Sequence, residues 1–189
     1  MATAAQHKDK LIQTAATLFR LQGYSATGIN EILAKSGAPK GSLYYYFPAG
    51  KEALAAAAVT FAGKGVSATL RQLRAETGNS REFIEQYCNL LAGWMENSNF
   101  KSGCPIATTL LETCPTSSTI QAVGLEVFEN WTRIIGDVFL DEGYTVKQAN
   151  AASLLVIAAV EGSLILSRTL SSVAPIHTIA AQLNRLEKA

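Results

Sequence analysis

The sequence is poor in the residues that build metal sites, disulfide frameworks and catalytic centres. Its 189 residues include three cysteines (Cys88, Cys104 and Cys114) and two histidines (His7 and His177). An odd number of cysteines does not suggest a secreted disulfide framework. The histidines are too far apart for a zinc site of the usual spacing. Because a glycine-rich phosphate loop and a nucleophile–base motif are also lacking, we expect no metal, no cofactor and no enzymatic activity.

The sequence also lacks an evident leader or membrane span. The opening residues MATAAQHKDK contain no apolar segment. The most apolar run, residues 154–160, is interrupted at Glu161 and is much shorter than the roughly 20 residues that cross a bilayer. We therefore expect a soluble, cytoplasmic protein.

The numbers of basic and acidic residues are nearly equal over the whole chain, but the two kinds are unevenly distributed between its N-terminal third and the rest. Residues 1–60 carry six lysine and arginine residues against three acidic ones, whereas the remaining residues carry ten against twelve. A basic N-terminal segment on a mildly acidic body favours a polyanionic partner for that segment.

Nearly every segment has helical periodicity, and the sustained alternation typical of strands is missing. With about half of its residues apolar, the chain can bury a sizeable core. The pattern predicts an all-α fold. The expected helices cover residues 8–22, 28–36, 40–46, 51 into the 70s, 80–96, a short segment between 103 and 114, 118–142, 146–171 and 176–186. We expect Thr27 to cap the second helix and Gly23 and Gly37 to end the first and second.

The N-terminal helices have the spacing of a helix-turn-helix. Two short helices are separated by a tight turn that contains Gly37 and Pro39, and the first helix can pack across both. The pattern is typical of DNA-binding domains, although all-α proteins that bind no DNA also contain such turns.

The stretch KGSLYYYFPAGKEAL, which begins at Lys40, contains three consecutive tyrosines. On a helix, Leu43 and Phe47 share one face and are the expected core anchors. Tyr45 then points almost directly away, while Tyr44 and Tyr46 lie roughly 80° to either side. One short helix therefore cannot bury all three rings.

A DNA groove explains this arrangement. Gly41 lies on the same outward face as Tyr45 and lets the helix approach closely, and Tyr45 can reach base edges. Lys40 supplies charge, and Lys51 begins the next helix, whose N-terminus is itself a phosphate site. The alternatives are that the tyrosines cover an intramolecular surface, or that the protein is a helical adaptor.

Residues 27–54, TGINEILAKSGAPKGSLYYYFPAGKEAL, resemble the DNA-binding signature of the TetR family of bacterial transcriptional regulators. The resemblance implies an N-terminal helix-turn-helix DNA-binding domain (1–52) and a larger C-terminal domain (53–189). The C-terminal domain would form a homodimer through its last two helices and bind an inducer. Repression of a palindromic operator is the default activity. The positions that match the family's DNA contacts are Thr27, Lys40, Gly41, Ser42, Tyr44, Tyr45, Tyr46 and Lys51.

The sequence departs from the family pattern at two positions. Pro39 stands where a Ser or Thr usually caps the recognition helix, and Gly50 lengthens the turn before Lys51. The longer turn and the segment 103–106, GCPI, are similar to the branch that contains the lincomycin-resistance and flavonoid-responsive repressors.

The resemblance also implies a cavity for the inducer among the central helices. Its candidate wall residues suit a flat, largely hydrophobic compound. They are Tyr87, Leu91, Trp94, Met95, Cys104, Thr108, Glu112, Phe128, Trp131 and Ile135. The alternative is that these residues form an ordinary aromatic core.

The cysteines suggest a second trigger. Cys104 and Cys114 are expected on one short helix, roughly 15 Å apart, so they cannot form a disulfide while that helix is intact. Cys104 would lie near the helix N-terminus, where thiol pKa values fall. A thiol-based redox-sensing regulator that uses Cys104 is therefore the alternative function, against a small buried apolar role for this residue.

Overall fold

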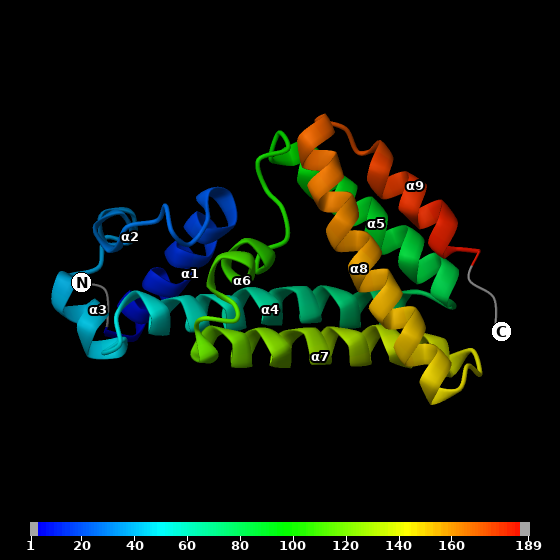
Figure 1. Cartoon of the computed structure of the whole chain (residues 1–189), viewed down its shortest axis with the longest axis horizontal. Coiled ribbons are helices and arrows are strands. Elements are labelled where there is room, and N and C mark those ends of the chain that lie inside the picture. The colour runs from blue at the N-terminus through cyan, green and yellow to red at the C-terminus, as the bar shows by residue number, and fades with distance from the viewer. Residues whose placement is uncertain (1–3, 186–189) are drawn as a thin grey trace. The chain divides into compact units, whose positions relative to one another are not determined.

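The computed structural model describes residues 4–185, and in that range it contains nine α-helices and no β-strand (Figure 1). The prediction of an all-α fold is confirmed. The helices are α1 (Ala4–Gln22), α2 (Ile29–Ser36), α3 (Lys40–Tyr46), α4 (Lys51–Glu76), α5 (Ser80–Asn97), α6 (Ala107–Thr113), α7 (Ser118–Asp141), α8 (Val146–Leu170) and α9 (Ala174–Leu183). The predicted end of the last helix at residue 186 lies outside the described residues.

The predicted cap of α2 is wrong. Gly28 is the N-cap residue, and no side chain caps this helix end. The Thr27 hydroxyl instead donates to the carbonyl oxygen of Gly23 over 2.7 Å, and Thr27 is completely buried. Gly23 and Gly37 end α1 and α2 in left-handed conformation, as expected.

The chain divides into two compact units. The first contains the residues up to 64 together with 104–127, and the second contains 65–103 and the residues from 128 onward. Helices α4 and α7 each contribute to both units. The first unit therefore extends beyond the DNA-binding domain expected at residues 1–52, because α6 and the first part of α7 pack with it.

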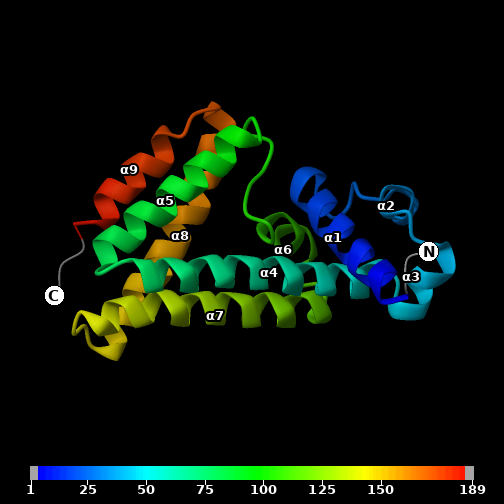
Figure 2. The same ribbon diagram turned by 180° about the vertical axis from the view of Figure 1, so that it is seen from behind.

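The core of the first unit joins the three N-terminal helices to α4. Leu11, Ile32, Leu43 and Leu54, from four successive helices, are each fully buried. Figure 2 shows α1 to α3 grouped at one end of α4. A Cβ atom at Gly63 would overlap the Val127 side chain, so a glycine here lets α4 and α7 approach closely.

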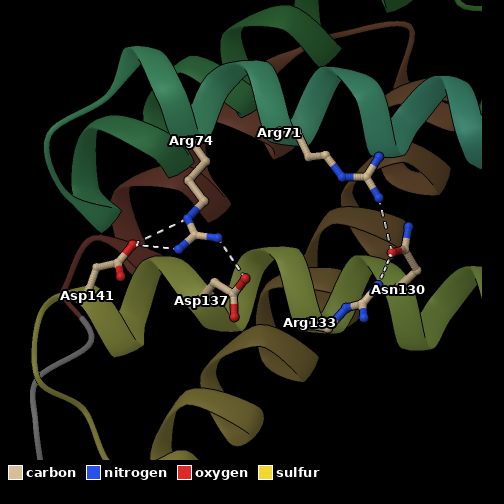
Figure 3. A network of polar contacts seen from close by, with 6 residues as sticks. All are labelled: Arg71, Arg74, Asn130, Arg133, Asp137 and Asp141. Carbon is tan, nitrogen blue, oxygen red and sulfur yellow. Dashed lines mark hydrogen bonds and ion pairs between the residues drawn. The ribbon is translucent and has the colours of Figure 1, made fainter.

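In the second unit, α5, α8 and α9 pack against one another (Figure 1). Segments of α4 and α7 in the same unit are linked by polar side chains (Figure 3). The Arg74 guanidinium contacts Asp137 over 2.6 Å and Asp141 over 2.9 Å. Arg71 and Arg133 both donate to the Asn130 amide oxygen. The bonds of Arg74 and Arg71 link α4 to α7, and that of Arg133 lies within α7.

Two helices, α4 and α8, are long and apolar enough to cross a membrane by length and composition. One or two such helices are weak evidence of a membrane span. The core helix of a soluble protein passes the same test of length and composition.

Candidate nucleic-acid interface and effector site

Helix α3 presents its tyrosines as the sequence predicts. Leu43 and Phe47 are buried and attach the helix to its domain. Tyr45 is 77% exposed and Tyr44 is 48% exposed, whereas Tyr46 is half-buried. The Tyr46 ring packs edge-on against Tyr45, with ring centroids 4.9 Å apart. The helix is thus anchored in the core of its domain, while the rings of Tyr44 and Tyr45 form an aromatic surface that no other part of the described chain covers.

Gly41 opens the same face of α3 to a partner. It is exposed, and a Cβ atom built at this position would have no atom of the chain within 4 Å. Its backbone also lies outside the positive-φ region that would require glycine. Packing within this chain therefore gives no reason for a glycine at this position.

The two departures from the family pattern have visible consequences. Pro39 is the N-cap residue of α3 and provides no side-chain cap, although its carbonyl oxygen accepts the Ser42 N–H over 2.9 Å. Gly50 has a φ of 68° and its N–H donates to the Phe47 carbonyl oxygen over 2.8 Å. The additional residue therefore closes a left-handed turn that only glycine adopts easily.

The remaining predicted DNA contacts differ in accessibility. Lys40 is exposed and Ser42 is half-buried, beside the exposed face of α3. Thr27 supports the α1–α2 turn from inside, because its side chain is buried and hydrogen-bonded. Lys51 is half-buried, and its Nζ lies 4.2 Å from the centre of the Tyr24 ring. Burial lowers the Lys51 pKa, and the charge of Glu112 opposes this shift.

Glu112 has a role that the sequence did not suggest. Its carboxylate accepts the backbone N–H of Ser25 over 2.6 Å, so it binds the turn between α1 and α2. The Ser25 hydroxyl, the Ser25 and Tyr24 backbone N–H groups and the charge of Lys51 lower the pKa of Glu112. The sequence carried no signal for this contact, since 87 residues separate the partners.

The ten predicted effector residues divide between the two units. Cys104, Thr108 and Glu112 belong to the first unit, and the other seven belong to the second. Within the second unit, Tyr87, Leu91, Met95, Trp131 and Ile135 are buried, Phe128 is half-buried, and Trp94 is 38% exposed. Phe128 packs edge-on against Trp131, with ring centroids 5.4 Å apart.

Trp94 lines an open cavity of about 510 Å³ between α4 and α5. Most of its wall is formed by side chains with hydrogen-bonding groups, and Leu73, Leu90 and Trp94 provide the apolar part. The full lining is Thr69, Gln72, Leu73, Glu76, Gln86, Asn89, Leu90 and Trp94. The volume suits a small organic molecule.

The cysteines give no support to a redox sensor. Cys104 and Cys114 do not lie on one helix as predicted, because α6 begins at Ala107 and Cys114 follows its last residue. Cys104 and Cys88 are buried, and burial raises the pKa of the Cys88 thiol to about 11. A buried, protonated thiol such as that of Cys88 reacts slowly with oxidants.

The helix-turn-helix and the exposed face of its second helix, α3, are the features of one class of protein. This class is the helix-turn-helix transcriptional regulators. The family model for the DNA-binding part of the bacterial tetR regulatory proteins matches residues 11–58. The model described as "Transcriptional regulator LmrA/YxaF-like, C-terminal domain" matches residues 80–182. The chain belongs to the TetR family of bacterial transcriptional regulators, as its signature predicted.

Individual relatives agree with this assignment. The regulator YxaF of Bacillus subtilis (strain 168) is 36% identical over 97% of this chain and 96% of its own length. The regulator LmrA of the same organism is 31% identical over 92% and 93%, respectively. A TetR regulatory protein from Rhodobacter sphaeroides shares the fold, with a TM-score of 0.84 at 20% identity over 94% of this chain and 96% of that chain. These relatives are regulators rather than enzymes.

Proposed function

We propose that this protein is a cytoplasmic, ligand-responsive repressor that binds a palindromic operator as a homodimer and releases it when a small, largely hydrophobic inducer binds. The observation that carries the proposal is the outward face of α3, where an unobstructed glycine lies beside a tyrosine that is 77% exposed. In this proposal α3 enters the major groove, and the DNA-binding domain ends near residue 52. The polar side chains beside this face, Lys40, Ser42 and Lys51, then contact DNA phosphates.

A dimer is supported by the surface of α8. Leu154, Leu155, Ile165 and Leu166 are between 46% and 62% exposed. They lie on one side of the helix, since Ile165 and Leu166 follow Leu154 by eleven and twelve residues, about three helical turns, and Ala158 lies between them. A monomeric protein rarely leaves such an apolar stripe uncovered. A second copy of the chain, docked along this face, would bury it in an isologous contact.

An inducer is supported by the cavity between α4 and α5. It combines an indole and two leucines with a rim of amide and carboxylate groups, a mixture that orients a planar ligand. A ligand that favours one spacing of the two recognition helices lowers the affinity for DNA that requires another spacing.

The DNA-binding proposal is tested at Lys51. In the Lys51→Ala variant we expect weaker binding to all DNA sequences and a salt dependence (log Kd against log salt concentration) shallower by about one unit, because one phosphate contact is lost. The affinity of the purified protein for its own upstream DNA, measured at several salt concentrations, gives the slope. Lys64→Ala is the matched control, since Lys64 is exposed further along the same helix. An unchanged slope for Lys51→Ala argues against phosphate contact.

The inducer proposal is tested by fluorescence of Trp94. Planar aromatic compounds that bind the cavity are expected to change the emission of Trp94 and to weaken DNA binding, because the indole lines the cavity and is partly exposed. The only other tryptophan, Trp131, is buried. The emission change should disappear in Trp94→Phe. A compound library that leaves both emission and DNA affinity unchanged would refute this site.

A further inference from the structure

The turn between α1 and α2 is built around the carboxylate of Glu112. The backbone N–H of Ser25 donates to this carboxylate over 2.6 Å, and the neighbouring Tyr24 N–H contributes to lowering the Glu112 pKa. Gly23 precedes them with a φ of 87°, and a Cβ atom there would overlap a Glu112 carboxylate oxygen. Consecutive backbone N–H groups next to a left-handed residue form a concavity that binds anions. In this chain the anion is a side chain carried by α6.

Tyr24 links this carboxylate to Lys51. It directly precedes Ser25, whose backbone N–H donates to Glu112, and its ring lies 4.2 Å from the Lys51 Nζ. The Tyr24 ring is itself fixed by Phe19, with ring centroids 5.5 Å apart. The ammonium of Lys51 therefore lies against a π face, and the carboxylate of Glu112, which forms no direct ion pair with it, attracts it at longer range.

The next residue of α4 is tied to the same part of the chain. The Ser117 hydroxyl donates to the Glu52 carboxylate, and the Ser117 oxygen accepts the N–H of Ile120 in the first turn of α7. The first two residues of α4 thus both interact with the segment that runs from α6 to the start of α7. This segment holds the N-terminus of α4, which directly follows the recognition helix and its turn.

We infer that Glu112 is a positioning residue for DNA binding: its carboxylate holds the α1–α2 turn and, together with Tyr24, restrains Lys51, so that it limits the positive charge offered to a DNA phosphate. This inference rests on the proposed function of Lys51 as a phosphate contact. DNA and Glu112 then compete for one ammonium group. The contribution of Lys51 to DNA affinity therefore depends on the position of the Glu112 carboxylate, which α6 determines.

The test is a double-mutant cycle. Glu112→Gln keeps an oxygen that accepts the turn N–H groups but removes the charge. We expect this variant to bind DNA about three- to tenfold more tightly at low salt, with a steeper salt dependence, because a charge near Lys51 and the phosphate is gone. In a Lys51→Met background the same substitution should have no effect. Glu126→Gln, which removes an exposed carboxylate from α7 in the same unit, is the control and should leave the affinity unchanged.

Two outcomes of the cycle would overturn the inference. One is an unchanged affinity in Glu112→Gln. The other is a gain of equal size in the Lys51→Met background, which would indicate a general effect of net charge. Because any duplex DNA reports the salt dependence, the cycle can be read even if no operator is found.

A measurement without DNA tests the turn itself. In Glu112→Ala, the backbone N–H of Ser25 loses its acceptor, so its hydrogen exchange is expected to accelerate at least tenfold relative to wild type. The exchange of buried α1 amides, such as that of Phe19, serves as the internal reference for folding. Unchanged exchange at Ser25 would show that Glu112 does not hold the turn.

Discussion

Replacement of both Leu154 and Ile165 by glutamate is expected to convert the protein to a monomer and to weaken its binding to a two-half-site operator by about a hundredfold or more. Each side chain is 62% exposed on the apolar stripe of α8. If a second subunit covers this stripe, two carboxylates per subunit would be buried without partners, at a cost that a dimer contact cannot offset. The DNA loss follows because a monomer holds only one recognition helix.

The control for this experiment is Val146→Glu. Val146 also lies on α8 and is 66% exposed, but it points roughly 140° away from the centre of the stripe. Light scattering of the purified variants measures their mass, and circular dichroism shows whether the helices are retained. A double variant that stays dimeric would place the dimer contact elsewhere on the protein. If Val146→Glu also converts the dimer to a monomer, the cause would be a general effect of added charge on α8.

The local features of the fold follow from the sequence because their causes are local. The predicted bounds of α3, residues 40–46, coincide with the observed ones. Pro39 fixes the backbone at one end, and the Leu43–Phe47 spacing determines which face is buried. The outward direction of Tyr45 is a consequence of that spacing alone. The family signature, residues 27–54, includes this helix and is itself a local feature of the sequence.

Contacts between distant segments could not be predicted in this way. Thr27 was expected to cap α2, but its hydroxyl donates back to Gly23 because the residue is buried in the turn. The periodicity of α6 shows an apolar face but not the helix it packs against. The observed packing places α6 in the unit of the N-terminal helices and brings Glu112 to the α1–α2 turn. A single sequence holds no record of such a pairing.

The Gly41→Ala variant is expected to be more stable than the wild-type protein but to bind DNA more weakly. The new methyl group would meet no atom of the chain within 4 Å, and alanine has the higher helix propensity. The free energy of unfolding should therefore rise by about 0.5–1 kcal/mol. DNA affinity should fall by about ten- to a hundredfold, because the methyl group would occupy the face of α3 that we propose approaches the bases. Thermal or denaturant unfolding measures the first quantity, and titration of operator DNA measures the second.

Gly65→Ala provides the matched comparison. Gly65 is an exposed glycine inside α4, and a Cβ atom there would also meet nothing within 4 Å. We expect the same sign of stability change in this variant and an unchanged affinity for DNA. A stabilised Gly41→Ala protein that binds DNA as tightly as wild type would show that the outward face of α3 does not approach a partner closely. The expected result is that Gly41→Ala raises stability and weakens DNA binding, whereas Gly65→Ala raises stability alone. This combination would indicate that Gly41 serves a contact with a partner rather than the fold of this chain.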